Sequence, residues 1–269
     1  MPAMTPLTAY INGIGVLGPG LADWPSTAAV LTAAAPYVAA ATVLPSPQAL
    51  PPAERRRTGA VVKLALAIGF EATTRAGIDP STLATVFASS GGDGFNCHEI
   101  CQVLASSERQ ISPTRFHNSV HNAAAGYWSI AAAATAAANV LCAFDASFGA
   151  GLLEGLTQVA VERIPVLLLA YDTQYPEPLH AKRPIPDAFG AAFVLAPDAC
   201  RASLAKVTAA LSASGGERMR EAQLEKLRRS IPAARSLPLL AKLARRESGR
   251  VILDYLPHAQ LALEVHPCS

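Results

Sequence analysis

The segment that most strongly predicts chemistry is NVLCAFDASFGAGLLEGL, residues 139–156. We expect a buried strand to end at Phe144, a tight turn to follow, and a glycine-containing helix to begin near Ser147. Such a turn holds its residues above a helix N-terminus, where backbone N–H groups and the helix dipole stabilise negative charge. Because thiolates and oxyanions are stabilised in this way, a nucleophile is expected here.

The residues of this turn, Asp145 and Ala146, include no thiol. The nearest thiol, Cys142, falls within the expected strand, where it is interpreted as a small buried apolar side chain. The turn therefore lacks the side chain that its backbone geometry would activate.

Ser147 is an alternative nucleophile, because Ser147-Phe148-Gly149 resembles the second half of a G-x-S-x-G elbow. Asp172 or Asp187, together with His258, would complete the order of a hydrolase triad. Against this, the first glycine of the elbow is replaced by Asp145, and a serine that caps the following helix is the simpler interpretation.

Two groups of residues have spacings that suit metal ligands. Cys97, His98 and Cys101 form a C-H-x-x-C group, but a structural zinc site needs about four ligands and the sequence offers no second pair. His117 and His121 are four residues apart, and structural hydrogen bonding is favoured for them over metal binding. We therefore expect no metal and no cofactor.

A further short motif, Gly91-Gly92-Asp93-Gly94, lacks both the lysine of a phosphate-binding P-loop and the spacing of a dinucleotide-binding loop. It is interpreted as a plain turn.

The elements that must position these residues alternate between strands and helices. Apolar runs predict strands at 8–16, 84–90, 139–144, 166–171, 188–197 and 203–211, and periodic patterns predict helices at 52–76, 95–104, 119–138 and 147–162. Strands that are apolar along their whole length indicate a sheet covered on both faces. The expected fold is α/β, with a central mixed sheet packed between helices.

Composition narrows the class of protein. Hydrophobic residues make up 51% and charged residues 16% of the chain, which argues against disorder. A net charge of +2 is too small to predict a nucleic-acid partner. The alanine-rich stretch 123–141 is interpreted as a buried helix that leads into a strand, not as a membrane span.

The start of the chain, MPAMTPLTAYINGIG, has no pattern of a signal peptide. The five cysteines are an odd number and are scattered along the sequence, which favours reduced thiols in a cytoplasmic protein.

The last part of the chain differs in composition. Residues 215–250 contain ten Lys and Arg residues and few acidic ones, and their leucine spacing predicts two amphipathic helices. We expect a basic helical extension over 213–250 and a tail over 251–269 that adds edge strands. The basic residues are usually a solvated face, although they could also dock an acidic partner.

Several segments resemble the β-ketoacyl synthases of the thiolase-like superfamily. YINGIGVLGPG (10–20) resembles their opening strand and turn, ISPTRFHNSVHNAAAGYWSIA (111–131) the segment before the nucleophile strand, and KRPIPDAFGAAFVLAPD (182–198) a later strand pair. The resemblance covers residues 8–212 in the same order and implies a ketoacyl-synthase N-terminal-like domain over 1–212 with a thiolase-like half fold.

The resemblance also shows two departures. The family's turn reads Ala-Cys-Ser/Thr-x-Gly, and the matching residues are Asp145 to Gly149, with Ala146 at the cysteine position. Complete family members have two similar halves, the second of which carries two catalytic histidines, and residues after 212 do not resemble those motifs. His258 and His266 lie in a short tail without the glycine-rich surroundings of the family's histidines.

Partner subunits that lack the cysteine and pair with a complete synthase are called chain-length factors. HNSVHNAAAGYW and AFDASFGAGLLE resemble the half-length forms of aryl polyene pigment clusters. The resemblance implies a chain that is not an active enzyme alone, that pairs with a complete ketoacyl synthase, and that meets acyl carrier protein indirectly.

In this interpretation, six residues lie at the acyl tunnel or the subunit interface: Phe144, Asp145, Ala146, Phe148, His117 and His121. The partner would supply the cysteine and both histidines. An acyltransferase or hydrolase that uses Ser147, and a degenerate scaffold without an acyl tunnel, are the alternatives.

Overall fold

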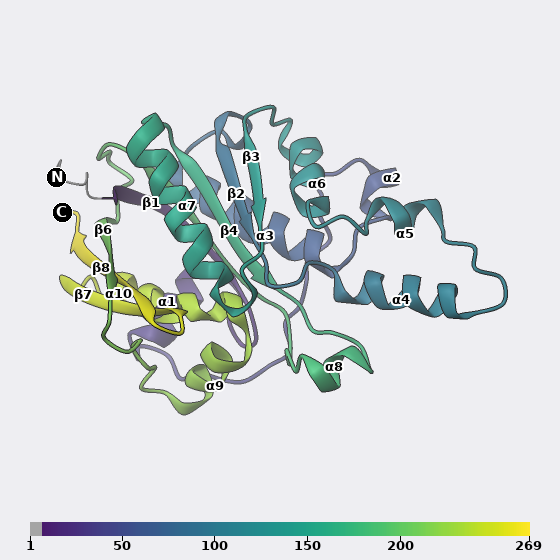
Figure 1. Cartoon of the computed structure of the whole chain (residues 1–269). Helices are drawn as coiled ribbons and strands as arrows, with labels where there is room; N and C mark the ends of the chain where they lie inside the picture. Colours follow the sequence, from purple (N-terminus) through teal and green to yellow (C-terminus); the bar gives the residue numbers. More distant parts are fainter. Residues whose placement is uncertain (1–6) are drawn as a thin grey trace.

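The computed structural model describes residues 7–269; residues 1–6, the start of the segment that lacks a signal-peptide pattern, lie outside the described part. Within that part, one eight-stranded sheet runs through the molecule in the order β3-β2-β4-β5-β1-β6-β8-β7 (Figure 1). The neighbours β3-β2 and β2-β4 are parallel, and every other pair is antiparallel. The prediction of a mixed α/β sheet is confirmed.

The strands are β1 (Leu7–Leu17), β2 (Ala84–Ala88), β3 (Ala138–Leu141), β4 (Val166–Asp172), β5 (Phe189–Ala196), β6 (Ala205–Ser212), β7 (Gly249–Leu256) and β8 (Ala259–Pro267). The α-helices are α1 (Trp24–Leu31), α2 (Pro52–Arg55), α3 (Ala60–Ala76), α4 (Gly94–Ala105), α5 (Pro113–His117), α6 (Ala123–Ala132), α7 (Ser147–Glu162), α8 (Leu179–Lys182), α9 (Ala222–Ser230) and α10 (Leu237–Ala244). Three 3₁₀ turns complete the structure: η1 (Pro80–Thr82), η2 (Phe144–Ala146) and η3 (Pro232–Ser236).

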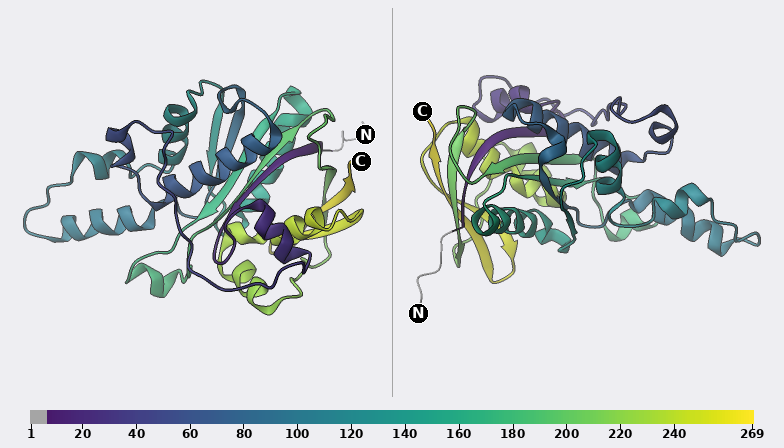
Figure 2. Two further views of the ribbon diagram at one scale, coloured as in Figure 1. Left: turned by 180° about the vertical axis from the view of Figure 1, so that it is seen from behind. Right: turned by 90° about the horizontal axis from the view of Figure 1, so that it is seen from above.

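Helices cover both faces of the sheet, as predicted. On one face, α3 and α6 pack on side chains such as Phe87 and Leu169; on the other, α7 packs on alternate residues such as Val86 and Leu168. Figure 2 shows the helices on both sides of the sheet. Every residue of β4 and β5 is buried, because successive side chains of a covered strand must enter one core or the other.

Glycines in β1 permit the closest contact between a helix and the sheet. A Cβ atom at Gly13 would lie 2.1 Å from the carbonyl oxygen of Ala72, and one at Gly15 would lie 2.0 Å from that of Ile68. No side chain fits at either position, so the NGIG sequence lets α3 lie directly on the strand.

The C-terminal segment is part of the main core. Leu224, Leu227, Ile231 and Leu240 belong to the same buried cluster as Phe148 of α7. Strands β8 and β7 extend the sheet beyond β6, so β7 forms one of its two edges. The basic residues of 213–250 therefore belong to helices whose apolar faces cover the sheet.

A projecting arm, residues 94–122, extends from the side of the molecule opposite the β7 edge (Figure 1). It consists of α4, a connecting loop and α5, and the residues of α4 that are buried are Gly94 and Asn96. The two helices are joined by an ion pair of 2.8 Å between Arg115 and Glu99 and by a hydrogen bond from Asn96 to the Arg115 carbonyl.

Three predicted elements differ from those in the structure. The helix expected over 52–76 is interrupted, because α3 begins anew after Gly59 as its N-cap. The helix expected over 119–138 is shortened to α6, which ends where Ala133 adopts a left-handed conformation with φ 51°. The N-cap of α6 is Asn122, and the Ser119 hydroxyl donates to the Phe116 carbonyl.

The strand expected over 139–144 is also shorter than predicted, because β3 ends at Leu141. Cys142 consequently lies beyond the strand and is exposed, so the prediction that it is buried is wrong. Among residues 7–269, the helices are all too short or too polar to cross a membrane.

Candidate functional site

The turn that should carry a nucleophile is formed as expected above the start of a helix. Residues 144–146 make the 3₁₀ turn η2, which leads directly into α7, and the Ala146 amide donates to the Ala143 carbonyl at 2.9 Å. The methyl side chain of Ala146 is buried at this position. The backbone that would activate a thiolate is therefore present without the thiol.

Ser147 stabilises the turn through its hydroxyl group. The hydroxyl donates to the Phe144 carbonyl at 2.7 Å and accepts the Ala143 N–H at 3.0 Å, and the side chain is buried. Ser147 is the first residue of α7, whose N-cap is Ala146, so its hydroxyl closes the preceding turn.

The residues considered as triad partners of Ser147 form no contact with its hydroxyl group among the described hydrogen bonds. Asp187 accepts the backbone N–H groups of Thr42 and Ala188, and His258 lies in the exposed turn between β7 and β8. The other candidate, Asp172, belongs to a separate buried cluster.

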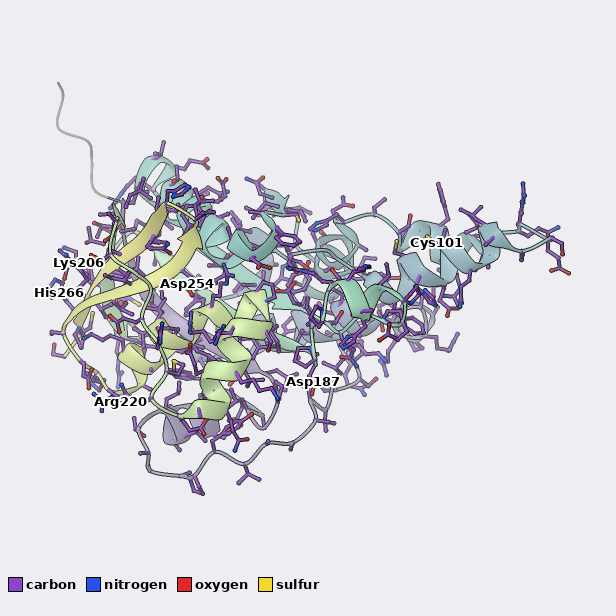
Figure 3. The ribbon with its side chains drawn as sticks, turned by 60° about the horizontal axis from the view of Figure 1, so that its bottom comes forward. Cys101, Asp187, Lys206, Arg220, Asp254 and His266 are labelled. Atoms are coloured by element: carbon purple, nitrogen blue, oxygen red, sulfur yellow. The ribbon has the colours of Figure 1, made fainter. Side chains whose placement is uncertain are left out.

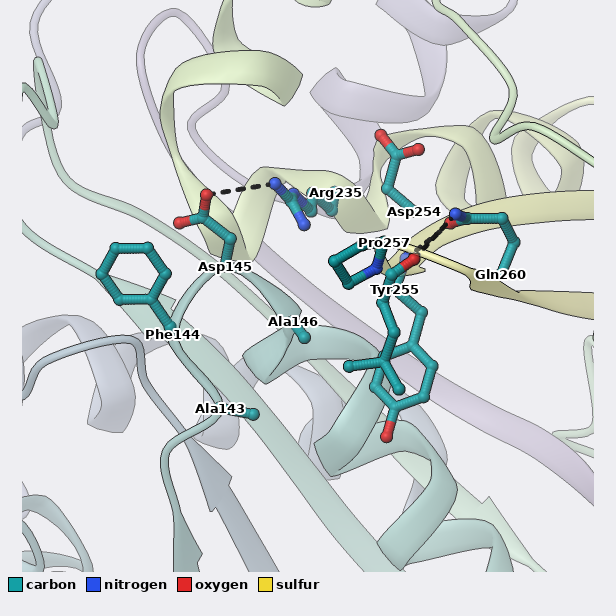
Figure 4. A pocket seen from close by; sticks show the side chains of 10 residues that line it. Ala143, Phe144, Asp145, Ala146, Arg235, Asp254, Tyr255, Pro257 and Gln260 are labelled. Atoms are coloured by element: carbon teal, nitrogen blue, oxygen red, sulfur yellow. Dashed lines mark hydrogen bonds and ion pairs between the residues drawn. The ribbon is translucent and has the colours of Figure 1, made fainter.

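Asp145 is held by two arginines that are distant in sequence. Its carboxylate lies 2.6 Å from a guanidinium nitrogen of Arg183. It also lies 3.3 Å from a guanidinium nitrogen of Arg235, the pair drawn in Figure 4. Arg235 comes from η3 in the C-terminal segment, and Arg183 follows α8. The two cations fix the carboxylate from two sides and so fix the turn that carries it.

A cavity of about 500 Å³ lies between the turn and the hairpin of β7 and β8. Its walls are Ala143, Phe144, Asp145, Ala146, Arg235, Asp254, Tyr255, Leu256, Pro257 and Gln260 (Figure 4). Tyr255 packs against the first turn of α7, since a Cβ atom at Gly149 would lie 2.7 Å from its ring. The glycine of the turn motif is thus required for packing of the hairpin.

Asp172 is a fully buried carboxylate at the carboxyl end of β4. It accepts hydrogen bonds from the Ser90 amide at 2.8 Å, the Ser90 hydroxyl at 2.6 Å and the Ala233 amide at 2.8 Å. Burial raises the pKa of Asp172 to about 6, although these hydrogen bonds and the positive charge of Arg183 oppose the shift. The residue ties the end of β2 to η3 and therefore to Arg235.

Phe148 does not line this cavity. Its ring is fully buried in the core, 6.0 Å from the ring of Phe193, and its expected place at the acyl tunnel or subunit interface stays a prediction. The reason is helical geometry: Phe148 follows Ser147 on the side of α7 that faces the sheet, while Ala146 faces the hairpin.

The two histidines lie apart from the turn, in different hollows. His117 is exposed on α5, edge-on to the ring of Tyr127 at 6.2 Å, and lines a groove between α5 and α6. His121 lines a small cavity with Asp93, where its Nε2 atom is buried without a hydrogen-bond partner among the described residues. Burial raises the pKa of Asp93.

The cysteines of the C-H-x-x-C group lie on the arm, at the far end of the molecule from Asp254 and the hairpin (Figure 3). Both Cys97 and Cys101 are exposed, and burial together with Cys101 raises the pKa of the Cys97 thiol. Across residues 7–269, the acidic, histidine and cysteine side chains form no group of three that would hold a metal.

A groove of about 520 Å³ and an open strand edge lie on the side of the molecule that carries the arm. The groove is lined mainly by apolar residues of α5 and α6, and includes Phe116, Val120, Gly126, Tyr127 and Ile130. Phe116, Val120 and Ile130 are largely exposed, as is Phe144 in the turn. Exposed apolar patches of this kind mark interaction sites.

Three site residues were missed by the sequence analysis: Arg183, Arg235 and Tyr255. Each reaches the turn from a segment that is distant in sequence, so no local pattern could identify it. Asp172 was considered only as a triad member, although a carboxylate directly after an apolar strand is a signal of a buried polar anchor.

Comparison with known proteins agrees with the fold. The profile of the β-ketoacyl synthase N-terminal domain matches residues 28–248, which includes the turn and most of the C-terminal segment. No curated protein sequence matches the chain.

Solved structures share the architecture. A chain from the complex of the ketosynthase ApeO with its chain length factor ApeC from Xenorhabdus doucetiae is 24% identical, with a TM-score of 0.72 over 96% of this chain and 99% of that one. A chain of the ishigamide ketosynthase/chain length factor is 13% identical, with a TM-score of 0.74 over 97% and 100% of the two chains.

A third chain, from a complex of a type II polyketide acyl-carrier protein with its ketosynthase, is 9% identical with a TM-score of 0.74 over 97% of this chain and 99% of that one. At these identities the likeness establishes a shared thiolase-like fold. Because the family profile spans most of its length, the chain belongs to the family of β-ketoacyl synthase N-terminal domains.

Proposed function

We propose that this chain is the non-catalytic, chain-length-factor-like partner subunit of a complete β-ketoacyl synthase, and that it shapes the tunnel into which the acyl chain grows. The observation that carries the proposal is the turn at Ala146. Its backbone, its helix and its glycine are formed as a nucleophile turn requires, but the reactive side chain is a methyl group. The turn therefore keeps its shape and its packing contacts, although it lacks the side chain that would act as the nucleophile.

The open edge of the sheet supports a partner. Ala138 and Asn139 of β3 are exposed, and β3 has a neighbour only on its β2 side among the described residues. An unpaired edge strand offers backbone N–H and C=O groups to a strand of another chain. The apolar groove of α5 and α6 and the exposed arm lie on the same side (Figure 1), so the three features form one candidate interface.

The known complexes support the kind of partner. One similar structure is a ketosynthase with its chain length factor, and another is described as a ketosynthase/chain length factor. By analogy, the partner of this chain would be a complete synthase that supplies the cysteine and both histidines. We place the pair in cytoplasmic fatty acid or polyketide-type biosynthesis, of the aryl polyene kind, where acyl carrier protein meets this chain only through the synthase.

Gly126 provides a direct test of this interface. It lines the groove, and a Cβ atom at this position would meet no heavy atom within 4 Å, so a large side chain fits the free subunit. We expect Gly126→Trp to fold normally, because a helix gains from losing an exposed glycine, and to weaken the complex at least tenfold. Gly215→Trp is the matched control, since its Cβ position is equally open and lies in the loop after β6.

The measurement is co-purification and light scattering of this chain with a co-expressed complete β-ketoacyl synthase. The wild type and Gly215→Trp should form a heterodimer, and Gly126→Trp should not. A wild-type chain that stays alone in the presence of the synthase, or that condenses acyl groups without it, contradicts the proposal.

A further inference from the structure

Four cationic side chains line one small cavity in the C-terminal segment. The cavity has a volume of about 150 Å³ and lies between the loop residues 217–220 and the end of α10. Arg218 and Arg220 line it from the loop, and Lys242 and Arg245, three residues apart on one side of the helix, line it from α10. A cavity of roughly this volume holds a molecule of the size of benzene, so a small ligand fits.

The two arginines of the loop have no partner within the described part of the chain. Among residues 7–269, neither Arg218 nor Arg220 forms an ion pair or a side-chain hydrogen bond, and both are exposed. Lys242 has one distant partner, since its Nζ atom lies 3.8 Å from the carboxylate of Glu247. Arg245 donates from its Nε atom to the last carbonyl of α1 at 3.2 Å, which holds the guanidinium group at the cavity.

The carboxylates of this region are engaged in other contacts. Glu217 accepts the Ile252 amide at 3.3 Å, and Glu221 accepts an amide in the first turn of α9 at 2.6 Å. Glu225 pairs with the buried Arg228 at 2.7 Å. Because like charges at short range repel one another, cations that gather without nearby carboxylates form a site for an anion.

The position of the cavity leaves it open to a ligand from solvent. Its floor is formed by Pro238 and Ala241, which are buried in α10, so the cations stand on a packed helix. Figure 3 shows Arg220 and the arm residue Cys101 at opposite ends of the molecule. The cavity is therefore remote from the groove and the arm of the candidate interface.

We propose that this cavity binds a phosphate group of a small ligand through Arg218, Arg220, Lys242 and Arg245. Guanidinium groups donate pairs of hydrogen bonds to phosphate oxygens, and an ammonium group adds a point charge. The lining contains these four cations and two carboxylates, Glu217 and Glu247, so its surplus is four minus two, or two positive charges. A phosphate group, with a charge of about −2 near pH 7, balances this surplus, whereas a single carboxylate does not.

The test is calorimetric titration of the full chain with inorganic phosphate and with pyrophosphate, at an ionic strength held constant with sodium chloride. We expect saturable binding at one site per chain. Arg218→Gln and Arg220→Gln should each weaken this binding about tenfold, because each variant loses a hydrogen bond between charged groups. Both residues are exposed, so both variants should fold.

Two further variants make the titration specific. Arg229→Gln is the matched control, because it removes an exposed arginine of α9 that does not line the cavity, and it should change the affinity by less than about twofold. Glu247→Gln should have the opposite effect. It removes the carboxylate that competes for Lys242, so we expect binding about threefold tighter.

The proposal is overturned by a wild-type chain that binds neither phosphate nor pyrophosphate above the chloride background. Equal losses in Arg218→Gln and Arg229→Gln also overturn it, since they would show a diffuse attraction to the whole basic face. Binding to vesicles that contain phosphatidic acid, without binding of either free anion, would assign the cations to a lipid surface instead. The titration needs no synthase, so its failure is distinguishable from failure of the proposed function.

Discussion

The two edges of the sheet differ in how they meet their surroundings. At the β7 edge, the backbone of Ile252 is already bonded: its carbonyl accepts the Glu217 amide at 2.7 Å and its amide donates to the Glu217 side chain at 3.3 Å. At the β3 edge, the strand is short and its outward residues are exposed. Proteins protect edges that face solvent, so the unprotected edge is the one expected to meet another chain.

The ion pairs of the two sides show the same contrast. Beside β7, Arg228 is buried and pairs with both Glu225 and Asp254, which links α9 to the hairpin. On the arm, the pair of Arg115 and Glu99 is partly exposed to water. The protected edge is thus supported by interactions within the chain, whereas the open side has apolar groups that no contact covers.

The largest expected effect concerns the protected edge. Arg228→Ala leaves the carboxylates of Glu225 and Asp254 facing each other without their cation, so we expect a loss of about 3–5 kcal/mol in the free energy of unfolding. Urea denaturation measures this loss. Arg250→Ala, which removes an exposed pair with Glu264, is the control and should change stability by less than about 0.5 kcal/mol. Equal losses in the two variants would remove the contrast between buried and exposed pairs.

The next largest effect on stability concerns Asp172, which connects the end of β2 to η3 through its bonds to Ser90 and Ala233. Its pKa in the folded chain is about 6, above the ordinary value of 3.8. A raised pKa contributes stability that is present below pH 3.8 and lost as the pH rises through about 6. Since each pKa unit corresponds to about 1.4 kcal/mol, the change is about 3 kcal/mol over this window.

Asp172→Asn should remove this dependence while it keeps an oxygen acceptor for Ser90. The measurement is the difference in unfolding free energy between about pH 4 and pH 7.5, compared between the variant and the wild type. The same difference in both proteins would show that Asp172 does not titrate in this window.

The smallest effect on the free chain, but a large one on its complex, is expected at the open edge. The backbone amides of Thr85 and Ser89 donate to the carbonyls of Ala137 and Leu141. The backbone N–H and C=O groups of the odd-numbered residues of β3 therefore point toward β2, and those of Ala138 point outward. Ala138→Pro removes an outward N–H and should change stability by less than about 0.5 kcal/mol.

The same Ala138→Pro variant should weaken binding of the synthase more than tenfold, as measured by titration. Asn139→Pro is the matched variant, because it removes an inward N–H and should destabilise the free chain itself. Unimpaired binding by Ala138→Pro would show that the partner does not pair with this edge.

The sequence alone determined the family, most strand and helix positions, and the missing thiol. Apolar runs predicted the strands that became β1, β4, β5 and β6. The prediction was clearest for β4 and β5, because a strand covered on both faces has apolar residues along nearly its whole length. The motif around Ala146 predicted a turn above a helix, because its glycine and its small residues act over a few positions.

Only the tertiary structure decided which side chains serve the turn. Cys142 is exposed, contrary to prediction, and Phe148 is buried in the core, because the orientation of a side chain depends on the elements that pack around it. Arg183 and Arg235 reach Asp145 from segments far along the chain. Local patterns report the preference of a segment for helix or strand, whereas contacts between distant segments arise only when the whole chain is packed.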